Sequence, residues 1–325
     1  MYKSKLSLLE TERAIKKLKD YFQEGLEKEL GLERISAPLF VDGESGLNDD
    51  LNGIEESVSF NHFEKTMQIV QSLAKWKRMA LHRYGFSVGE GLYADLNAIR
   101  KDEVLSPIHS LYVDQWDWEL IIGKEQRNME VLKKVVEKIY NVFKSTNTYI
   151  IKNYGQLAKE LPDGIHFITS QELYDIYPKK TPKEREYEIT KKYKAVFITQ
   201  IGCTLSNGEV HDARSPDYDD WSLNGDIVIY NEVLDQAFEL SSMGIRVDEE
   251  TLLKQLEISN CMERTKLDFH KKLLSGKLPY TIGGGIGQSR LCMYFLDKVH
   301  IGEVQATYWP KEIRDECKEK GIRLL

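Results

Sequence analysis

The sequence predicts an α+β fold in which helices flank an antiparallel β-sheet. Apolar residues recur at helical spacing near the start of the chain, at Ile15, Leu18, Phe22 and Leu26. Four short apolar runs in the second half have strand-like composition and hairpin-like gaps between them. They lie at residues 165–168, 195–198, 225–230 and 237–240. Strands that follow one another without alternating helices favour an antiparallel sheet.

The first predicted elements are a helix, a strand and a loop. Gly31 is a helix stop, and the strand predicted over 32–38 ends at Pro38, a residue typical of edge strands. Residues 42–53 are rich in Gly, Asn and Asp and predict an ordered loop, where ligand contacts often lie. Residues 67–82 predict a helix, or a strand followed by a helix.

A strand-loop-strand unit and a long helix come next. Residues 92–100 and 110–119 predict two strands, and the loop between them carries Glu103 and His109. Apolar residues at helical spacing over 132–143 predict an amphipathic helix. Its apolar stripe is typical of core packing.

The composition is that of an ordinary globular protein. Of 325 residues, 41% are hydrophobic and 30% are charged, which allows one large core or two modest ones. The chain has no linker rich in Pro, Ser or Gly and no internal repeat, so we expect a single domain over residues 1–325. No apolar stretch approaches the ~18 residues that would span a membrane, and the first residues lack an apolar signal segment. We therefore expect a cytoplasmic protein without a membrane partner.

Charge and cysteine content weigh against two classes of function. The net charge of -7 disfavours a broad nucleic-acid surface, because such surfaces cluster Lys and Arg. The four cysteines are widely scattered and form no Cys-x-x-Cys pair, so neither a zinc site nor a disulfide framework is indicated. We expect reduced thiols and no nucleic-acid partner.

Two arginines in contexts that suit phosphate are the most informative feature of the chain. Arg100 ends a predicted strand, and Arg290 closes the run Gly-Gly-Gly-Ile-Gly-Gln-Ser-Arg at 283–290. The planar guanidinium matches phosphate oxygens and stacks on a flat base, and glycine lets the backbone approach a ligand closely. Taken alone, the glycine run is equally typical of a tight turn that opens a helix. The two arginines together are more specific and favour a bent triphosphate ligand.

Two carboxylates lie inside apolar strand patterns, at Asp226 and Glu239. A lone carboxylate is costly to bury without a partner. The pair therefore indicates either a shared cation or local pairing of each carboxylate with an arginine or a strand end.

Three long blocks of sequence resemble one enzyme family. They are Ser-Leu-Ala-Lys-Trp-Lys-Arg at 72–78, Tyr-Val-Asp-Gln-Trp-Asp-Trp-Glu at 112–119 and His-Asp-Ala-Arg-Ser-Pro-Asp-Tyr-Asp-Asp-Trp at 211–221. Through them the chain resembles the ammonia-dependent asparagine synthetases, or aspartate-ammonia ligases, which have the class II aminoacyl-tRNA synthetase catalytic-domain fold. The likeness implies ATP-dependent synthesis of L-asparagine from L-aspartate and ammonia through a β-aspartyl-adenylate. AMP and pyrophosphate would be released.

The resemblance also implies roles for the nucleotide-binding residues. Arg100 would grip the α-phosphate of ATP and the activated carboxylate, and Arg290 would lie near adenine and the outer phosphates. Glu103 and His109 would contact the nucleotide. The chain has Arg-x-x-Glu where synthetases commonly have Arg-x-Glu, which weakens the assignment of Glu103 to adenine, although the asparagine synthetase pattern itself is met.

Further roles follow from the same resemblance. Asp226 and Glu239 align with the acidic pair that holds Mg²⁺ against the ATP phosphates, since hard cations select oxygen ligands. Asp49, in the acidic loop at 46–53, would bind ammonium and favour loss of its proton, whereas the residue pattern alone is also typical of an Asx-turn. Gln115 would hydrogen-bond the substrate side chain. The residues expected to bind aspartate are Ser72, Lys77, Asp117, Arg214, Asp219, Ser242 and Arg246.

A homodimer is also implied. The predicted helix around Phe22 and the strand at 32–38 resemble the first class II motif, whose helix and strand build a dimer interface. Their position at the head of the chain fits this motif.

Three other functions remain for comparison. The first is a tRNA-charging enzyme for asparagine or aspartate, or a synthetase-like paralogue that modifies another acceptor. Either would share the adenylate step. Charging of tRNA, however, needs an anticodon-binding module, and the first predicted helix begins too early in the chain to leave room for one. A glutamine-dependent amide synthase is disfavoured, because Tyr2 and not a cysteine follows Met1. A non-catalytic regulator is disfavoured by the joint presence of the two arginines and the two strand carboxylates.

Overall fold

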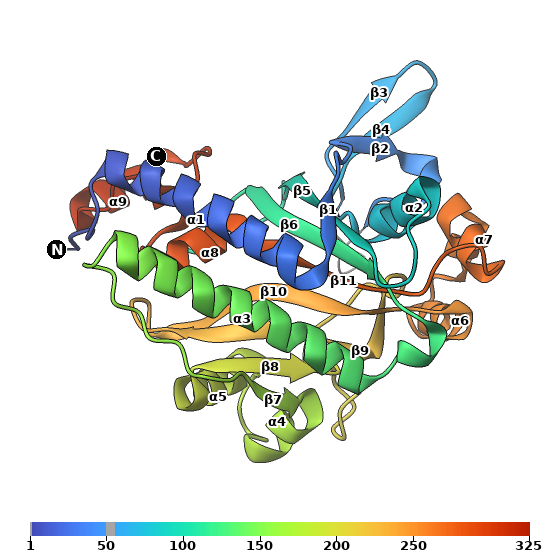
Figure 1. The fold of residues 1–325 in the computed structure, drawn as a ribbon. Helices are drawn as coiled ribbons and strands as arrows, with labels where there is room; N and C mark the ends of the chain where they lie inside the picture. Colours follow the sequence, from blue (N-terminus) through green and yellow to red (C-terminus); the bar gives the residue numbers. More distant parts are fainter. Residues whose placement is uncertain (1, 50–55) are drawn as a thin grey trace.

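The computed structural model describes residues 2–49 and 56–325, in which helices cover a mixed, mostly antiparallel sheet (Figure 1). In this part of the chain the main sheet has eight strands, in the order β1-β5-β6-β11-β10-β9-β8-β7. Their bounds are Leu32–Arg34 (β1), Gly91–Ile99 (β5), Tyr112–Ile121 (β6), Thr281–Gly287 (β11), Gln236–Arg246 (β10), Asp219–Asn231 (β9), Ala195–Thr199 (β8) and His166–Thr169 (β7). A smaller sheet projects from the body in Figure 1. It comprises Phe40–Asp42 (β2), Lys65–Ile69 (β4) and Ser59–His62 (β3).

Helices cover both faces of the main sheet. α1 and α3 run side by side across one face (Figure 1), while α2 packs on the other face at β5 and α4 and α5 do so at β8. Within the described residues, no helix is both long enough and apolar enough to cross a membrane. The helices are Leu8–Leu30 (α1), Ala74–Tyr84 (α2), Met129–Asn153 (α3), Ser170–Ile176 (α4), Pro182–Tyr193 (α5), Glu249–Ile258 (α6), Asp268–Leu274 (α7), Gln288–Phe295 (α8) and Lys311–Lys320 (α9).

The first helix confirms the prediction made from its apolar spacing. Ser7 caps its start by accepting a hydrogen bond from the backbone N–H of Glu10, and Gly31 ends it in the left-handed conformation with φ of 66°. The ring of Phe22 is fully buried and lies 4.8 Å, centroid to centroid, from the ring of Trp116 on β6. The apolar face of α1 therefore packs directly on the sheet.

Alternation along β6 separates the hydrophobic core from the other face of the sheet. Trp116 and Trp118 are buried in the core beneath α1 and α3. Gln115, Asp117 and Glu119 point to the opposite face, because successive side chains of a strand alternate. One strand thus supplies both large apolar rings and a row of polar groups.

The prediction of an antiparallel sheet is confirmed for the central strands and wrong at both edges. β1 pairs with β5 in parallel and β7 pairs with β8 in parallel, whereas the central pairings from β5 to β8 are antiparallel. Parallel neighbours need a crossover connection. The small sheet and α2 provide it between β1 and β5, and α4 and α5 provide it between β7 and β8.

The glycine run is a central strand and not a turn. β11 contains Gly283, Gly284 and Gly285, and α8 begins directly after it. A Cβ at Gly283 would lie 2.0 Å from Oε2 of Glu119, and one at Gly284 would lie 2.5 Å from Cβ of Met243. These positions need glycine because neighbouring groups approach the backbone closely. The sequence pattern alone is equally typical of a turn.

Candidate active site

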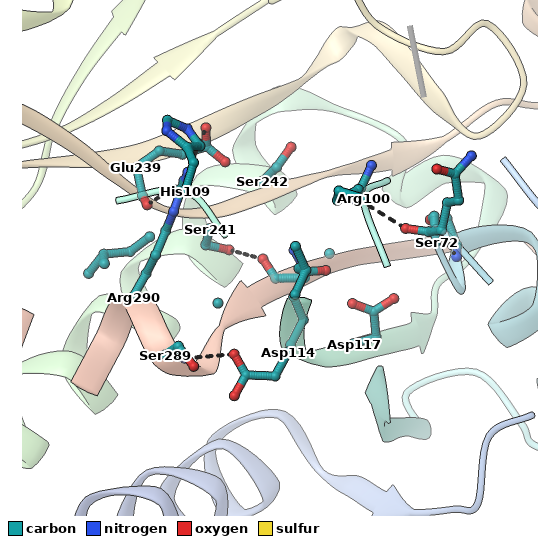
Figure 2. Close-up of a pocket in the computed structure, with 18 of the residues that line it drawn as sticks. Ser72, Arg100, His109, Asp114, Asp117, Glu239, Ser241, Ser242, Ser289 and Arg290 are labelled. Atoms are coloured by element: carbon teal, nitrogen blue, oxygen red, sulfur yellow. Dashed lines mark hydrogen bonds and ion pairs between the residues drawn. The ribbon is translucent and has the colours of Figure 1, made fainter. Parts of the chain in front are cut away.

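A cavity of about 460 Å³ lies over the central strands, on the face opposite the core beneath α1 and α3. This volume is within the range of small-molecule sites. Thirteen of the fifteen residues predicted from the sequence line it, several of which appear in Figure 2. They are Ser72, Lys77, Arg100, Glu103, His109, Gln115, Asp117, Arg214, Asp219, Glu239, Ser242, Arg246 and Arg290. The other two, Asp49 and Asp226, are buried and are not among the described lining residues.

The two predicted arginines reach the cavity from different elements. Arg100 follows β5, and its Nη2 donates to the backbone oxygen of Gln71 at 3.1 Å. Arg290 lies in the first turn of α8, and its Nη1 donates to the backbone oxygen of Glu239 at 3.2 Å. Figure 2 shows the two side chains at separate places around one cavity. The sequence prediction that they share a site is thus consistent with their positions.

The loop between β5 and β6 brings His109 close to Arg290. The ring Nδ1 of His109 lies 2.8 Å from Oγ of Ser106, which holds the loop closed on itself. Burial, and after it the positive charge of Arg290, lower the pKa of His109 to about 4. The ring is therefore neutral at pH 7 and can contact a nucleotide without adding charge.

A β-bulge in β10 brings side chains from both halves of this strand to the cavity. Its pairing with β9 shifts between Glu239 and Ser241. Core side chains lie at even positions before the bulge and odd positions after it, namely Phe238, Leu240, Met243 and Ile245. Glu239 therefore shares the cavity face with Ser242 and Arg246. A period-2 pattern of apolar residues in the sequence does not predict this bulge.

Asp226 and Glu239 fit the donor set of a Mg²⁺ ion. Oδ2 of Asp226 accepts a hydrogen bond from Nη2 of Arg214, and Oδ1 is buried without a hydrogen-bond partner among the described residues. Burial and the charge of Glu239 raise the pKa of Asp226, while Arg214 opposes the shift. The described residues contain no group of three His, Cys, Asp or Glu side chains that could hold a metal. Phosphate and water oxygens would therefore complete the coordination, as is usual for Mg²⁺.

A buried ionic cluster forms one wall of the cavity. Nε and Nη2 of Arg246 donate to Oε1 and Oε2 of Glu119 at 2.9 and 2.7 Å, and its Nη1 donates to Asp219. Burial alone would raise the pKa of Glu119, but the charge and hydrogen bonds of Arg246 outweigh it and hold that pKa below its usual range. The three residues come from β10, β6 and β9, so the cluster ties the central strands together.

Lys77 extends this cluster from α2. Its Nζ donates to the backbone oxygens of Trp118 and Gly284, both at 3.0 Å, and lies 3.4 Å from Oδ2 of Asp117. Burial lowers the pKa of Lys77. Oδ1 of Asp117 has no hydrogen-bond partner among the described residues, and Asp117 lines the cavity. It is an acceptor available to a ligand cation.

Asp49 is connected to the cavity wall through Gln71. Nε2 of Gln71 donates to the backbone oxygen of Asp49 at 2.9 Å, while the backbone oxygen of Gln71 accepts from Arg100. Oδ1 of Asp49 accepts from Oγ of Ser215 at 2.9 Å. Residues 50–53 of the predicted acidic loop lie outside the described residues.

Comparison with known proteins identifies the family. The family model described as aspartate-ammonia ligase matches residues 9–321. The chain is 62% identical over 327 residues to the aspartate-ammonia ligase of Clostridium perfringens strain 13, covering 100% of this chain and 97% of that protein. It is 58% identical over 325 residues to the aspartate-ammonia ligase of Fusobacterium nucleatum, covering 100% and 99%.

The chain belongs to the aspartate-ammonia ligase family. It is therefore a ligase. Solved structures agree in fold with this member of the family. The asparaginyl-tRNA synthetase of Pyrococcus horikoshii, complexed with asparaginyl-adenylate, superposes with a TM-score of 0.67 at 15% identity, covering 92% of this chain and 70% of that one. The asparaginyl-tRNA synthetase of Entamoeba histolytica gives 0.66 at 12% identity, covering 92% and 67%. Both support the predicted class II synthetase fold.

Two polar residues of this aspartate-ammonia ligase family member escaped prediction, although both lie in the block at 112–119. Glu119 binds Arg246, and its position at alternate spacing from Asp117 was the available signal. Oδ1 of Asp114 accepts from the backbone N–H of Ser289 at 3.0 Å. Gly287, the N-cap of α8, has no side chain to cap that helix, so Asp114 caps it and fixes the turn that carries the second arginine.

We expect the ring of His109 to titrate in NMR spectra with a midpoint near its pKa of about 4. Replacing Arg290 with methionine removes a nearby positive charge, so this midpoint should rise. Because the folded pKa lies below the ordinary 6.5, the unfolded chain binds this proton more readily. Stability should therefore fall as pH drops from about 6.5 towards 4. A midpoint at or above the ordinary value would contradict the burial seen here.

Proposed function

We propose that this ligase forms L-asparagine from L-aspartate and ammonia, with ATP, through a β-aspartyl-adenylate, and releases AMP and pyrophosphate. Membership of the aspartate-ammonia ligase family supports the substrates. The observation that carries the adenylate step is the meeting of Arg100, Arg290 and Glu239 at one cavity. This set can bind a triphosphate beside an amino acid.

The first step follows from the chemistry of the carboxylate. Ammonia cannot displace hydroxide from a carboxylate, so the side-chain carboxylate of aspartate attacks the α-phosphorus of ATP and pyrophosphate leaves. Negative charge develops on phosphate oxygens, and Arg100 and Arg290 lower the barrier by preorganised positive charge. Each guanidinium is held by a backbone oxygen, so little reorganisation is needed. No protein nucleophile takes part.

Mg²⁺ bound by Asp226 and Glu239 would neutralise the charge of the ATP phosphates. Asp226 offers a buried oxygen without a described hydrogen-bond donor, and Glu239 lines the cavity. Hard oxygen ligands of this kind select Mg²⁺. Arg214 then has the additional role of holding Asp226 in place, because its Nη2 donates to Oδ2 of Asp226. Burial alone would lower the pKa of Arg214, but Asp226 and Asp212 raise it, so the guanidinium stays charged.

Aspartate is expected to bind against the ionic cluster. Arg246 has five N–H donors and directs only part of them to Glu119 and Asp219, so the remainder can bind the α-carboxylate. Oδ1 of Asp117 can accept from the α-ammonium. Gln115 would orient the side-chain carboxylate. The other proposed contacts are Ser72, Lys77, Arg214 and Ser242, all of which line the cavity.

The second step is attack of ammonia on the adenylate carbonyl. Ammonium predominates at neutral pH, so a carboxylate must bind this cation and take a proton from it. Asp49 is the proposed acceptor, because Gln71 connects it to the arginine of the first step. Glu103 and His109 complete the nucleotide site.

Replacing Arg100 with alanine should reduce aspartate-dependent exchange of pyrophosphate into ATP by at least about 100-fold, since it removes a charge that stabilises the transition state. The assay contains no RNA. Arg83→Ala is the matched control, because Arg83 is an exposed arginine at the end of α2. Both variants should keep the circular dichroism spectrum of the unmodified protein. Undiminished exchange in Arg100→Ala would remove this residue from the mechanism.

Asp49→Asn should separate the two steps. The substitution keeps the size of the side chain but removes the proton acceptor, so amide formation should fall by about 100-fold while pyrophosphate exchange changes less than about threefold. Single-turnover reaction of the preformed adenylate with ammonium chloride measures the second step alone. Equal loss in both steps would rule out the assigned role with ammonium.

We also propose a homodimer in which β1 contributes to the interface. β1 is an edge strand of the main sheet whose partner among the described strands is β5, and Glu33 and Arg34 are exposed. An exposed edge offers unpaired backbone groups to a second chain. Sedimentation equilibrium at micromolar concentration should give the mass of two chains, and the mass of one chain would contradict this assembly.

A single domain over 1–325, a cytoplasmic location and the lack of a nucleic-acid partner stay proposals, the last supported by the net charge of -7.

A further inference from the structure

A buried polar network lies on the far side of Asp49 from Gln71. Oγ of Ser215 is 2.9 Å from Oδ1 of Asp49 and also 2.9 Å from Oδ1 of Asp217. Ser215 is 3% exposed and Asp217 is fully buried. Neither is among the described residues that line the cavity. The proposed function leaves this network unexplained.

Asp217 is held as an anion by three cationic or ionisable groups. Its Oδ2 lies 3.0 Å from Nζ of Lys75 on α2, 3.1 Å from Nη1 of Arg264 and 2.9 Å from Nε2 of His270 on α7. Burial alone would raise the pKa of Asp217, but Lys75 and His270 outweigh it and hold that pKa well below its usual range. Both oxygens of Asp217 therefore act as hydrogen-bond acceptors.

The hydroxyl of Ser215 has too few hydrogens for two ionised neighbours. It carries one hydrogen, yet it faces one carboxylate oxygen of Asp49 and one of Asp217. While Asp49 is ionised, only one of these contacts can be a hydrogen bond. When Asp49 holds a proton, its O–H donates to Oγ of Ser215 and the hydroxyl of Ser215 donates to Asp217. Both contacts are then hydrogen bonds, so Ser215 can satisfy the protonated form of Asp49 and the ionised Asp217 at once.

We propose that Ser215 and Asp217 are positioning residues that fix Asp49 and stabilise it while it holds the proton taken from ammonium. This inference rests on the proposed function. A proton passes from ammonium to the Asp49 carboxylate, and the ammonia that forms keeps the electron pair. That pair makes the new C–N bond, and AMP leaves with the electrons of the broken acyl C–O bond. The nitrogen then loses its extra proton to a phosphate oxygen of the departing AMP, which leaves the neutral amide. The Ser215 hydroxyl turns towards Asp217, and no proton has to reach Asp217.

Ser215→Ala tests the proposal by removing the hydroxyl alone. Pyrophosphate exchange should stay within about twofold of the unmodified protein, whereas the rate of amide formation from the preformed adenylate should fall about tenfold. Ser215→Thr keeps a hydroxyl and should recover most of this loss. Ser170→Ala is the matched control, because Ser170 is a buried serine on α4 whose Oγ donates to the backbone oxygen of Gln200. It should change neither step.

The double variant supplies a readout that a purely structural role would not give. Because Ser215 acts through Asp49, Ser215→Ala should slow amide formation by less than about twofold when Asp49 is already asparagine. Full additivity would overturn the proposal, as would an unchanged amide rate or equal loss of both steps in Ser215→Ala. If the unmodified protein shows no aspartate-dependent exchange, the proposed function itself fails. Normal exchange with an unaffected amide rate rejects only the role of Ser215 and Asp217.

Discussion

The pairing of Arg246 with Glu119 is the constraint on which the cavity depends. Arg246 projects from β10 and Glu119 from β6, and the strand between them, β11, has Gly283 where the two side chains meet. A Cβ at that glycine would lie 2.0 Å from Oε2 of Glu119 and 2.6 Å from Nη2 of Arg246. Charges buried to this depth persist only when each is paired. The glycine and the ion pair are therefore one structural unit, and the strand order is fixed around it.

The opposite face of the sheet makes it possible to bury these charged groups, although their burial is unfavourable for folding. The opposite face buries large apolar groups against α1 and α3, including Phe22, Trp116 and Trp118. Each residue of β6 thus serves one face only, and the hydrophobic burial needed for folding is separated from the charged groups needed for chemistry. The bulge in β10 keeps this separation while bringing Glu239 to the same face as Arg246. A regular strand would place one of them in the core.

Local patterns in the sequence were sufficient to predict α1, α3 and most of the central strands. Burial of one face sets the amphipathic periodicity of such elements. The shared site of Arg100 and Arg290 was also anticipated, from the strand end and the glycine run that precede them and from family likeness, but not from periodicity. The glycine strand could not be predicted, since residues without side chains leave no pattern. The parallel pairing of β7 with β8 was missed because α4 and α5, which connect these two strands, were missed. Ser215 and Asp217 have partners far away in the chain, and no local signal marks such contacts.

Under the proposed function, the burial of Asp49 also bears on how the adenylate escapes hydrolysis. An exposed carboxylate would activate water as readily as it would accept a proton from ammonium, and water is far more abundant. Asp49 is 1% exposed, and Gln71 and Ser215 hold its backbone and its carboxylate. A buried anion attracts a cation much more strongly than a neutral molecule, because the attraction grows as the surroundings become less polar. Burial of this carboxylate is unfavourable for folding, but it therefore favours ammonium over water at the second step.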